Sequence, residues 1–296
     1  MTYHLKSMTL ALLAATGAAI AQDGPAGAAA RAEEMTHDAG ARIVYGDSLA
    51  IGKGRYHTYV RTSAKGEPLA VGVKFHKTTL SALPTEPETD GSTCFDLNGD
   101  NEIDLHEECV GGHSRTMSFS PNPTPFKSIT INWEPHGHVP VDIYDRPHFD
   151  FHFYMISDIE RKTIFPGTCP GLVNCALAAK AILPLPARYV HPDFFNTKLV
   201  YAQMGNHYAD STSPEFHGQV FTQTFILGEF GGKTTFYEPM VTLEYLMGEP
   251  DQCTPIKQPQ AFASAGWYPT RYCIRYDRRN DFYDVSLAGF RYRVAG

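Results

Sequence analysis

The stretch HFDFHFY, residues 148–154, alternates polar and aromatic residues without a break. Successive side chains of a β-strand point to opposite faces, so this alternation predicts a strand whose phenylalanines share one face. That face has to be buried against another layer, because it consists of large aromatic rings. The opposite face carries His148, Asp150 and His152. The chain must therefore accommodate a row of ionisable groups on a strand that is otherwise typical of a protein core.

Several other segments show the same period of two or are rich in β-branched and aromatic residues, which is typical of strands. Residues 55–63 and 68–75 are joined by a glycine-containing turn and predict a hairpin. Residues 171–182 instead predict a helix that ends before Pro184. We therefore expect a mainly β fold: an antiparallel β-sandwich or barrel with long loops and one short helix, forming a single domain over residues 42–296.

The N-terminal residues differ in composition from the rest. Residues 1–21 combine Lys6, a short apolar run and small residues before Gln22, which predicts a secretory signal peptide. Residues 22–41 are rich in alanine and glycine and predict a flexible leader. We expect an exported protein, periplasmic or extracellular, without a membrane span. The net charge of −7 provides no electrostatic reason to bind nucleic acid.

Six cysteines in an exported chain favour disulfides over thiolate metal sites. Sequential pairing is one of many connectivities that six cysteines allow, and free buried thiols are the alternative. Each sequential pair closes a short loop, so we expect this pattern. The predicted bonds are Cys94–Cys109, Cys169–Cys175 and Cys253–Cys273.

The segment DLNGDNEIDLHE, residues 96–107, matches a twelve-residue calcium loop. Its sixth position holds Asn101 in place of the usual glycine, and asparagine tolerates the left-handed backbone that this turn requires. Its flanks do not look helical, so we expect an EF-hand-like structural loop, inserted at 94–109. A solvated acidic loop is the alternative interpretation. The predicted ligands are Asp96, Asn98, Asp100, Glu102 (through its backbone), Asp104 and Glu107.

The polar face of residues 148–154 predicts a second metal site. Side chains at positions i and i+2 of a strand lie roughly 6.6 Å apart at Cα, so Asp150 can share one ion with a neighbouring histidine. We expect Asp150 and His152 to be the primary ligands, and His148 to join them only across a bulge. Nitrogen and oxygen donors suit zinc, iron, manganese or copper. The predicted ligand set is His138, His148, Asp150, His152, His207 and Glu238.

A structural alternative exists for the same residues, namely a buried His–Asp–His ladder of hydrogen bonds that holds the strand in register. The two hypotheses differ in what the site needs. Burying a carboxylate beside two imidazoles without a cation would cost several kcal/mol unless the histidines were protonated or hydrogen-bonded to it, and a metal ion would remove that cost. An enzyme would in addition need a cleft that reaches Asp150 and His152.

The motifs PHFDFHFY and FYEPM resemble an uncharacterised family of exported bacterial proteins, a domain of unknown function first described from Thermus. The similarity spans roughly residues 44–296. It implies a compact β-rich domain that can form homo-oligomers, and it supplies no activity. The candidate transition-metal ligands fall in the two longer segments that carry the resemblance, residues 132–156 and 203–242, whereas His136 and the calcium-like loop look particular to this chain.

These observations favour an exported metal-binding β-rich domain with a structural calcium loop. A cupin-like metal-dependent enzyme, either a hydrolase or an oxygenase, is the second hypothesis. A purely structural exported module or oligomer subunit is the third. The sequence leaves open whether the chain is an enzyme and which small molecule, if any, it binds.

The calcium loop leads to a first prediction. We expect calorimetry to detect one calcium ion with a Kd of about 10⁻⁴ to 10⁻³ M, as in extracellular modules. Glu107→Gln removes the bidentate ligand and should abolish this heat and the gain in melting temperature caused by millimolar calcium. A variant that melts like the wild type in calcium would contradict the prediction.

Overall fold

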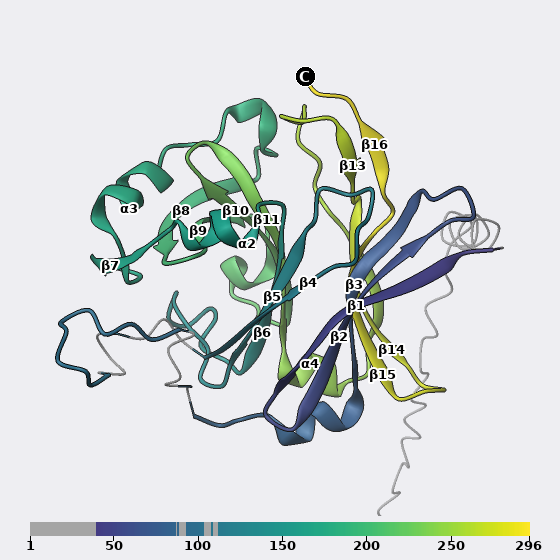
Figure 1. The fold of residues 1–296 in the computed structure, drawn as a ribbon, viewed down its shortest axis with the longest axis horizontal. Coiled ribbons are helices and arrows are strands. Elements are labelled where there is room, and N and C mark those ends of the chain that lie inside the picture. Colours follow the sequence, from purple (N-terminus) through teal and green to yellow (C-terminus); the bar gives the residue numbers. More distant parts are fainter. Residues whose placement is uncertain (1–39, 87, 89–92, 104–107, 109–111) are drawn as a thin grey trace, which may run out of the picture. The chain divides into compact units, whose positions relative to one another are not determined.

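The computed structural model describes residues 40–86, 88, 93–103, 108 and 112–296. Its strands form two large antiparallel sheets and a small third one (Figure 1). The six-stranded sheet has the order β1 (Arg42–Ile51), β2 (Gly54–Thr62), β3 (Pro68–His76), β15 (Phe282–Ala288), β14 (Arg271–Asp277) and β12 (Asp251–Pro255). The seven-stranded sheet has the order β4 (His113–Ser118), β5 (Ser128–Glu134), β6 (His148–Tyr154), β11 (Lys233–Thr242), β10 (Gln223–Phe230), β9 (Gly205–Asp210) and β8 (Phe194–Tyr201).

Both sheets have two free edges, so the fold is sandwich-like and not a closed barrel. The third sheet pairs β13 (Gly266–Tyr268) with β16 (Arg291–Arg293), and β7 (Pro166–Cys169) lies outside these sheets. The mainly β, antiparallel prediction is therefore confirmed, and of its two alternatives the sandwich is the correct one.

The aromatic face of β6 lies in the core between the two large sheets. Phe149, Phe151 and Phe153 are fully buried, as the alternation predicts. The Phe149 ring lies 6.2 Å from the Phe75 ring of β3, and the Phe151 ring stacks on Phe75 at 6.5 Å. Phe75 in turn stacks on Tyr283 of β15. These rings join the two sheets, and they leave the opposite face of β6 pointing out of the sandwich core.

Helices are more numerous and shorter than predicted. The predicted helix at 171–182 begins only at Cys175, because the Asn174 side chain accepts hydrogen bonds from the first free backbone N–H groups. This helix, α3, spans Cys175–Ala181. The described residues also include α2 (Asp158–Lys162), α4 (Leu243–Met247) and three 3₁₀ turns, η1 (Lys77–Ala82), η2 (Ala187–Tyr189) and η3 (Pro214–His217). The sequence indicated only one of these helices, because helices of five residues are too short to show a 3.6-residue period.

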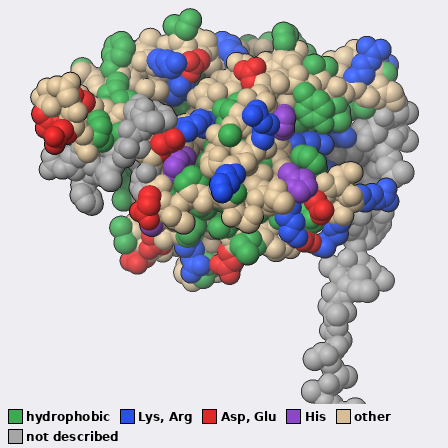
Figure 2. All heavy atoms as spheres, turned by 60° about the horizontal axis from the view of Figure 1, so that its bottom comes forward, with side chains coloured by type: hydrophobic (Ala, Val, Ile, Leu, Met, Phe, Trp, Pro, Cys, Tyr) green, Lys and Arg blue, Asp and Glu red, His purple; other side chains and the backbone are tan. Residues whose placement is uncertain are grey.

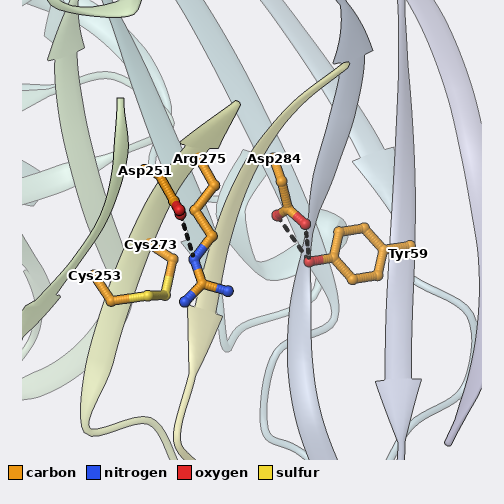
Figure 3. The surroundings of a disulfide bond; sticks show 6 residues. All are labelled: Tyr59, Asp251, Cys253, Cys273, Arg275 and Asp284. Atoms are coloured by element: carbon orange, nitrogen blue, oxygen red, sulfur yellow. Dashed lines mark hydrogen bonds and ion pairs between the residues drawn. A yellow bond between two sulfur atoms is a disulfide. The ribbon is translucent and has the colours of Figure 1, made fainter. Parts of the chain in front are cut away.

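Two of the predicted disulfides are present. Cys169 of β7 bonds to Cys175 at the start of α3. Cys253 of β12 bonds to Cys273, directly opposite on β14 (Figure 3). The third predicted pair includes Cys109, which lies outside the described residues, so that pairing stays a prediction.

The described part of the calcium-like loop has the expected turn. Asp96 accepts hydrogen bonds from the backbone N–H groups of Gly99 and Asn101 through its two carboxylate oxygens. Asn101 has a φ of 65°, the left-handed conformation that its position requires. Asp104 and Glu107 lie outside the described residues. Calcium binding therefore stays a prediction.

The predicted signal peptide and almost all of the predicted leader also lie outside the described residues, which begin at Gly40. Among the described residues, no helix is long and apolar enough to cross a membrane. On the face drawn in Figure 2, basic and acidic side chains of the described residues are interspersed, without a large patch of either sign. The absence of nucleic-acid binding stays a prediction.

The aromatic junction leads to a second prediction. Phe151→Ala removes a fully buried ring between the sheets and should lower the free energy of unfolding by about 3–5 kcal/mol. Urea denaturation measures the change. Phe165→Ala is the matched control because its ring is 56% exposed, and it should change stability little. Equal effects of the two variants would contradict the assigned core.

Candidate metal centre

The candidate ligands lie on the outer face of the seven-stranded sheet, over its middle strands. In the β5–β6 register, Asn132 lies opposite Asp150 and Glu134 lies opposite His148. On the other side of β6, Met240 lies opposite Asp150 and Phe236 lies opposite Tyr154. This antiparallel register places Glu238 of β11 beside His152. Polar residues that alternate with core residues in β5, β6 and β11 therefore lie together on one face of the sheet.

The first group of ligands combines His138, His148 and Asp150, and their donor atoms all lie within 4.8 Å of one another. The two oxygens of the Asp150 carboxylate face different histidines. Oδ1 lies 3.1 Å from Nε2 of His148, and Oδ2 lies 3.3 Å from Nε2 of His138. His138 belongs to the loop between β5 and β6. We refer to this group as the first triad.

The second group combines His152, His207 and Glu238, again with all donor atoms within 4.8 Å. Nε2 of His152 lies 3.3 Å from Oε1 of Glu238, and Nε2 of His207 lies 3.9 Å from Oε2. The three residues come from β6, β9 and β11. We refer to this group as the second triad. Each triad therefore offers two imidazoles and one carboxylate.

Backbone hydrogen bonds orient three of these histidines. In His138, His148 and His207, Nδ1 lies 2.7, 2.6 and 3.0 Å from a backbone carbonyl oxygen. Because a carbonyl only accepts, Nδ1 must carry the proton, and in the neutral ring Nε2 then holds a lone pair. These lone pairs face carboxylates. Metal-binding histidines in proteins are commonly fixed in this way.

Several nitrogen and oxygen atoms of the two triads are buried without a hydrogen-bond partner among the described residues. They include Nε2 of His148 and Oδ1 of Asp150, which lie close together but lack hydrogen-bond geometry. Both ring nitrogens of His152 and Oε2 of Glu238 are likewise buried without a hydrogen-bond partner among the described residues. Leaving such groups unsatisfied costs about 1–3 kcal/mol each, and more for charged groups. A self-contained ladder of hydrogen bonds does not fit this pattern, whereas a cation between the donors does.

The electrostatics of the first triad show how strongly its carboxylate attracts positive charge. Burial alone would raise the pKa of Asp150, but His148 and His138 outweigh burial and hold the pKa well below its usual range. Burial alone would likewise lower the pKa of His138, but the Asp150 carboxylate beside it raises the pKa to about 9. In the absence of metal, a proton on His138 thus supplies the positive charge next to Asp150.

The second triad is neutral in the absence of metal. Burial lowers the pKa of His152 to about 3 and that of His207 to about 4. Burial and the nearby charge of Asp150 raise the pKa of Glu238 well above its ordinary value. Neutral imidazoles are ready to bind a metal, whereas Glu238 would have to release a proton on binding.

A cavity of about 810 Å³ opens onto this polar face. Five of the six triad residues line it, the exception being His148, and so does Glu134. Residues at its edge are accessible to solvent: the exposed fractions are 45% for Val139 and 41% for Phe195. The cleft that an enzyme or a ligand-binding protein requires therefore reaches both Asp150 and His152.

A glycine shapes the wall of the second triad. Gly228 of β10 pairs with His207 on one side and with Phe236 on the other. A Cβ atom at this position would lie 2.1 Å from the Phe236 ring. The ring lies instead 4.8 Å from the His152 ring and 5.3 Å from the His207 ring. The missing side chain thus lets Phe236 pack between the strands and support both histidines.

The structure groups the predicted ligands differently from the single site expected around Asp150 and His152. Asp150 meets His148 on an unbulged strand, because neighbours at i and i+2 can both turn towards one point. His152 instead meets Glu238 across the strand pair. The ligand residues thus form two groups, and strand alternation alone could not show which partners each residue has.

Two further residues of the centre were missed from the sequence. Glu134 is buried beside the first triad and accepts a hydrogen bond from the Gly112 N–H at 2.7 Å. Tyr201 lines the cavity, and its ring lies 5.5 Å from that of His207. For Glu134 a signal existed, because it lies on the polar face of an alternating strand that ends in NWE. Tyr201 carries no comparable signal.

No family model, curated protein or solved structure matches this chain. The resemblance to the exported bacterial family stays a prediction from its motifs. We therefore infer the function from the geometry of the centre.

Glu134 leads to a third prediction, on pH. Burial, reinforced by Asp150, raises its pKa from 4.5 to about 7. Its contribution to stability is therefore present below the unfolded pKa and is lost as pH rises through 7. Glu134→Gln keeps an acceptor for the Gly112 N–H and cannot ionise. In metal-free protein, we expect the variant to gain about 1–3 kcal/mol relative to the wild type between acidic pH and about pH 8.

Urea denaturation of metal-free protein across this pH range measures the effect. Glu86→Gln is the control because the Glu86 side chain is 82% exposed and should show no such trend. A constant difference in stability between Glu134→Gln and the wild type at all pH values would contradict the raised pKa.

Proposed function

We propose that the protein is an exported metal-binding protein that holds two divalent transition-metal ions, one in each triad. The observation that carries this proposal is a close approach, at 3.1–3.3 Å, of a buried histidine Nε2 to a carboxylate oxygen without hydrogen-bond geometry. One such pair of atoms occurs in each triad. A cation between a carboxylate and the Nε2 lone pairs would satisfy these atoms and remove the cost of burying them.

The donor set indicates the class of metal. Two imidazoles and one carboxylate suit zinc, iron, manganese or copper, and the absence of sulfur donors from both triads argues against a site selective for soft ions. Three protein ligands leave coordination positions open for water or another small ligand. Because both triads contribute residues to one cavity, a molecule inside it could contact either ion.

A metal-dependent enzyme is the second candidate, and the cavity is the observation that favours it. A divalent ion with an open position lowers the pKa of bound water and polarises carbonyl groups. Glu134 lines the same cavity with a pKa near 7, which suits a residue that accepts or donates a proton at neutral pH. Hydrolase or oxygenase chemistry would both be compatible with this arrangement.

Export and a structural calcium ion belong to the same proposal. The two disulfides, Cys169–Cys175 and Cys253–Cys273, are compatible with an oxidising compartment outside the cytoplasm. The turn at Asp96 supports the calcium-like loop as a structural element. A purely structural module or oligomer subunit is less well supported, because a structural ladder would satisfy the buried atoms of the two triads.

The fourth prediction concerns metal content. Mature protein loaded with Zn²⁺ and dialysed should contain two ions per chain by elemental analysis, in addition to any calcium. His148→Ala removes one ligand of the first triad, and His207→Ala removes one of the second. Each variant should retain about one ion, because the other triad is intact, and the double variant should retain none.

His57→Ala is the matched control, since His57 lies on β2 in the other sheet and should leave both ions in place. Thermal melting of the metal-free variants shows whether each one folds. Loss of all metal in either single variant would indicate one shared site, and absence of metal in the loaded wild type would support the structural ladder.

A further inference from the structure

The walls of the cavity are mainly apolar. The larger apolar side chains of the lining come from β8, β10, β11, η3 and the turn between β8 and β9. They are Phe195, Leu199, Met204, Phe216, Ile226 and Met240. Such walls stabilise an apolar body and offer little to a sugar or a nucleotide, which need many hydrogen-bonding groups. The cavity volume of about 810 Å³ is in the range of small-molecule sites.

The charge of the cavity depends on metal. Its lining among the described residues includes three carboxylates, those of Glu134, Asp150 and Glu238, and neither lysine nor arginine. Without metal, the described lining therefore offers no lysine or arginine that would attract an anion. Two divalent ions would more than neutralise these carboxylates and leave at least one positive charge. The loaded cavity would therefore attract a monoanion, and its open coordination positions would take an oxygen donor.

Tyr201 supplies a further polar group to the cavity, beside the second triad. Its hydroxyl has no hydrogen-bond partner among the described residues, and its ring lies beside His207 of the second triad. A phenol is a good donor to a charged oxygen. Together with the proposed metal ions, it would define a polar end, whereas most of the remaining lining is apolar.

We propose that the metal-loaded cavity binds a small monocarboxylate with an apolar body, its carboxylate on the metal ions and Tyr201 and its body against Leu199 and Met204. This inference rests on the proposed function, because without the ions the lining has no lysine or arginine to attract the carboxylate. It adds the class of ligand, or of substrate if the protein is an enzyme. Aliphatic and aromatic acids share this chemistry.

The fifth prediction uses zinc-loaded protein of measured metal content and calorimetric titration with acetate, butanoate and hexanoate. Affinity should rise about fourfold with each added methylene, because each one is buried against the apolar walls. Hexanamide, which has the same body without the charge, should bind much more weakly. Metal-free protein should bind none of these acids. Benzoate distinguishes aromatic from aliphatic bodies, and the tighter of benzoate and hexanoate identifies the preferred shape.

Two variants test the polar and the apolar parts of the cavity separately. Tyr201→Phe should weaken acetate and hexanoate by about tenfold each, because a hydrogen bond to a charged group is lost at the polar end. Leu199→Ala should weaken hexanoate alone, because it shortens the apolar wall. Leu183→Ala is the control, since Leu183 is 54% exposed and does not line the cavity. None of these substitutions changes a triad residue, so the zinc content should stay at two.

The outcomes distinguish the two proposals. Protein that holds two zinc ions but binds hexanoate no more tightly than acetate, or no more tightly than hexanamide, would overturn the ligand class and leave the metal centre intact. Metal-free protein that binds hexanoate as tightly as loaded protein would also overturn it. Protein that takes up no zinc would contradict the proposed function and, with it, this inference.

Discussion

Burial of the aromatic face of β6 against the six-stranded sheet is the constraint on which the rest of the structure depends. Phe149 and Phe151 pack against Phe75, and this junction holds the two sheets together. Because strand side chains alternate, the same packing turns His148, Asp150 and His152 to the outer face. The position of the candidate metal centre is therefore a geometric consequence of how the core is packed.

The outer face is stable only if its polar atoms find partners. Backbone carbonyls hold Nδ1 of three histidines, and these bonds turn the Nε2 lone pairs towards Asp150 and Glu238. In the absence of metal, a proton on His138 provides the positive charge at Asp150, and Glu238 holds its proton. Metal binding would replace these protons, so the affinity for metal should fall as pH falls. Protonation and metal occupancy are thus alternative ways to balance the same buried charges.

Much of the fold could be predicted from local patterns, and the site only in part. The alternation of 148–154 predicts the strand, its buried face and its row of ionisable groups. The Cys253–Cys273 bond could be predicted because the two residues are near in sequence and close one loop. Helices α2 and α4 were missed because each is only five residues long. The grouping of the ligands depends on pairings between distant segments, such as β6 with β11, which no local period encodes.

The sequence by itself determined which residues could bind metal and which face of the strand would carry them, because strand periodicity is a property of the backbone. The tertiary structure alone decided that Asp150 pairs with His148 and His138, and that His152 pairs with Glu238 and His207. It also brought Glu134 and Tyr201 to the same cavity. These contacts join five elements of one sheet and a loop. They arise from sheet register and from packing around Gly228, neither of which a single segment contains.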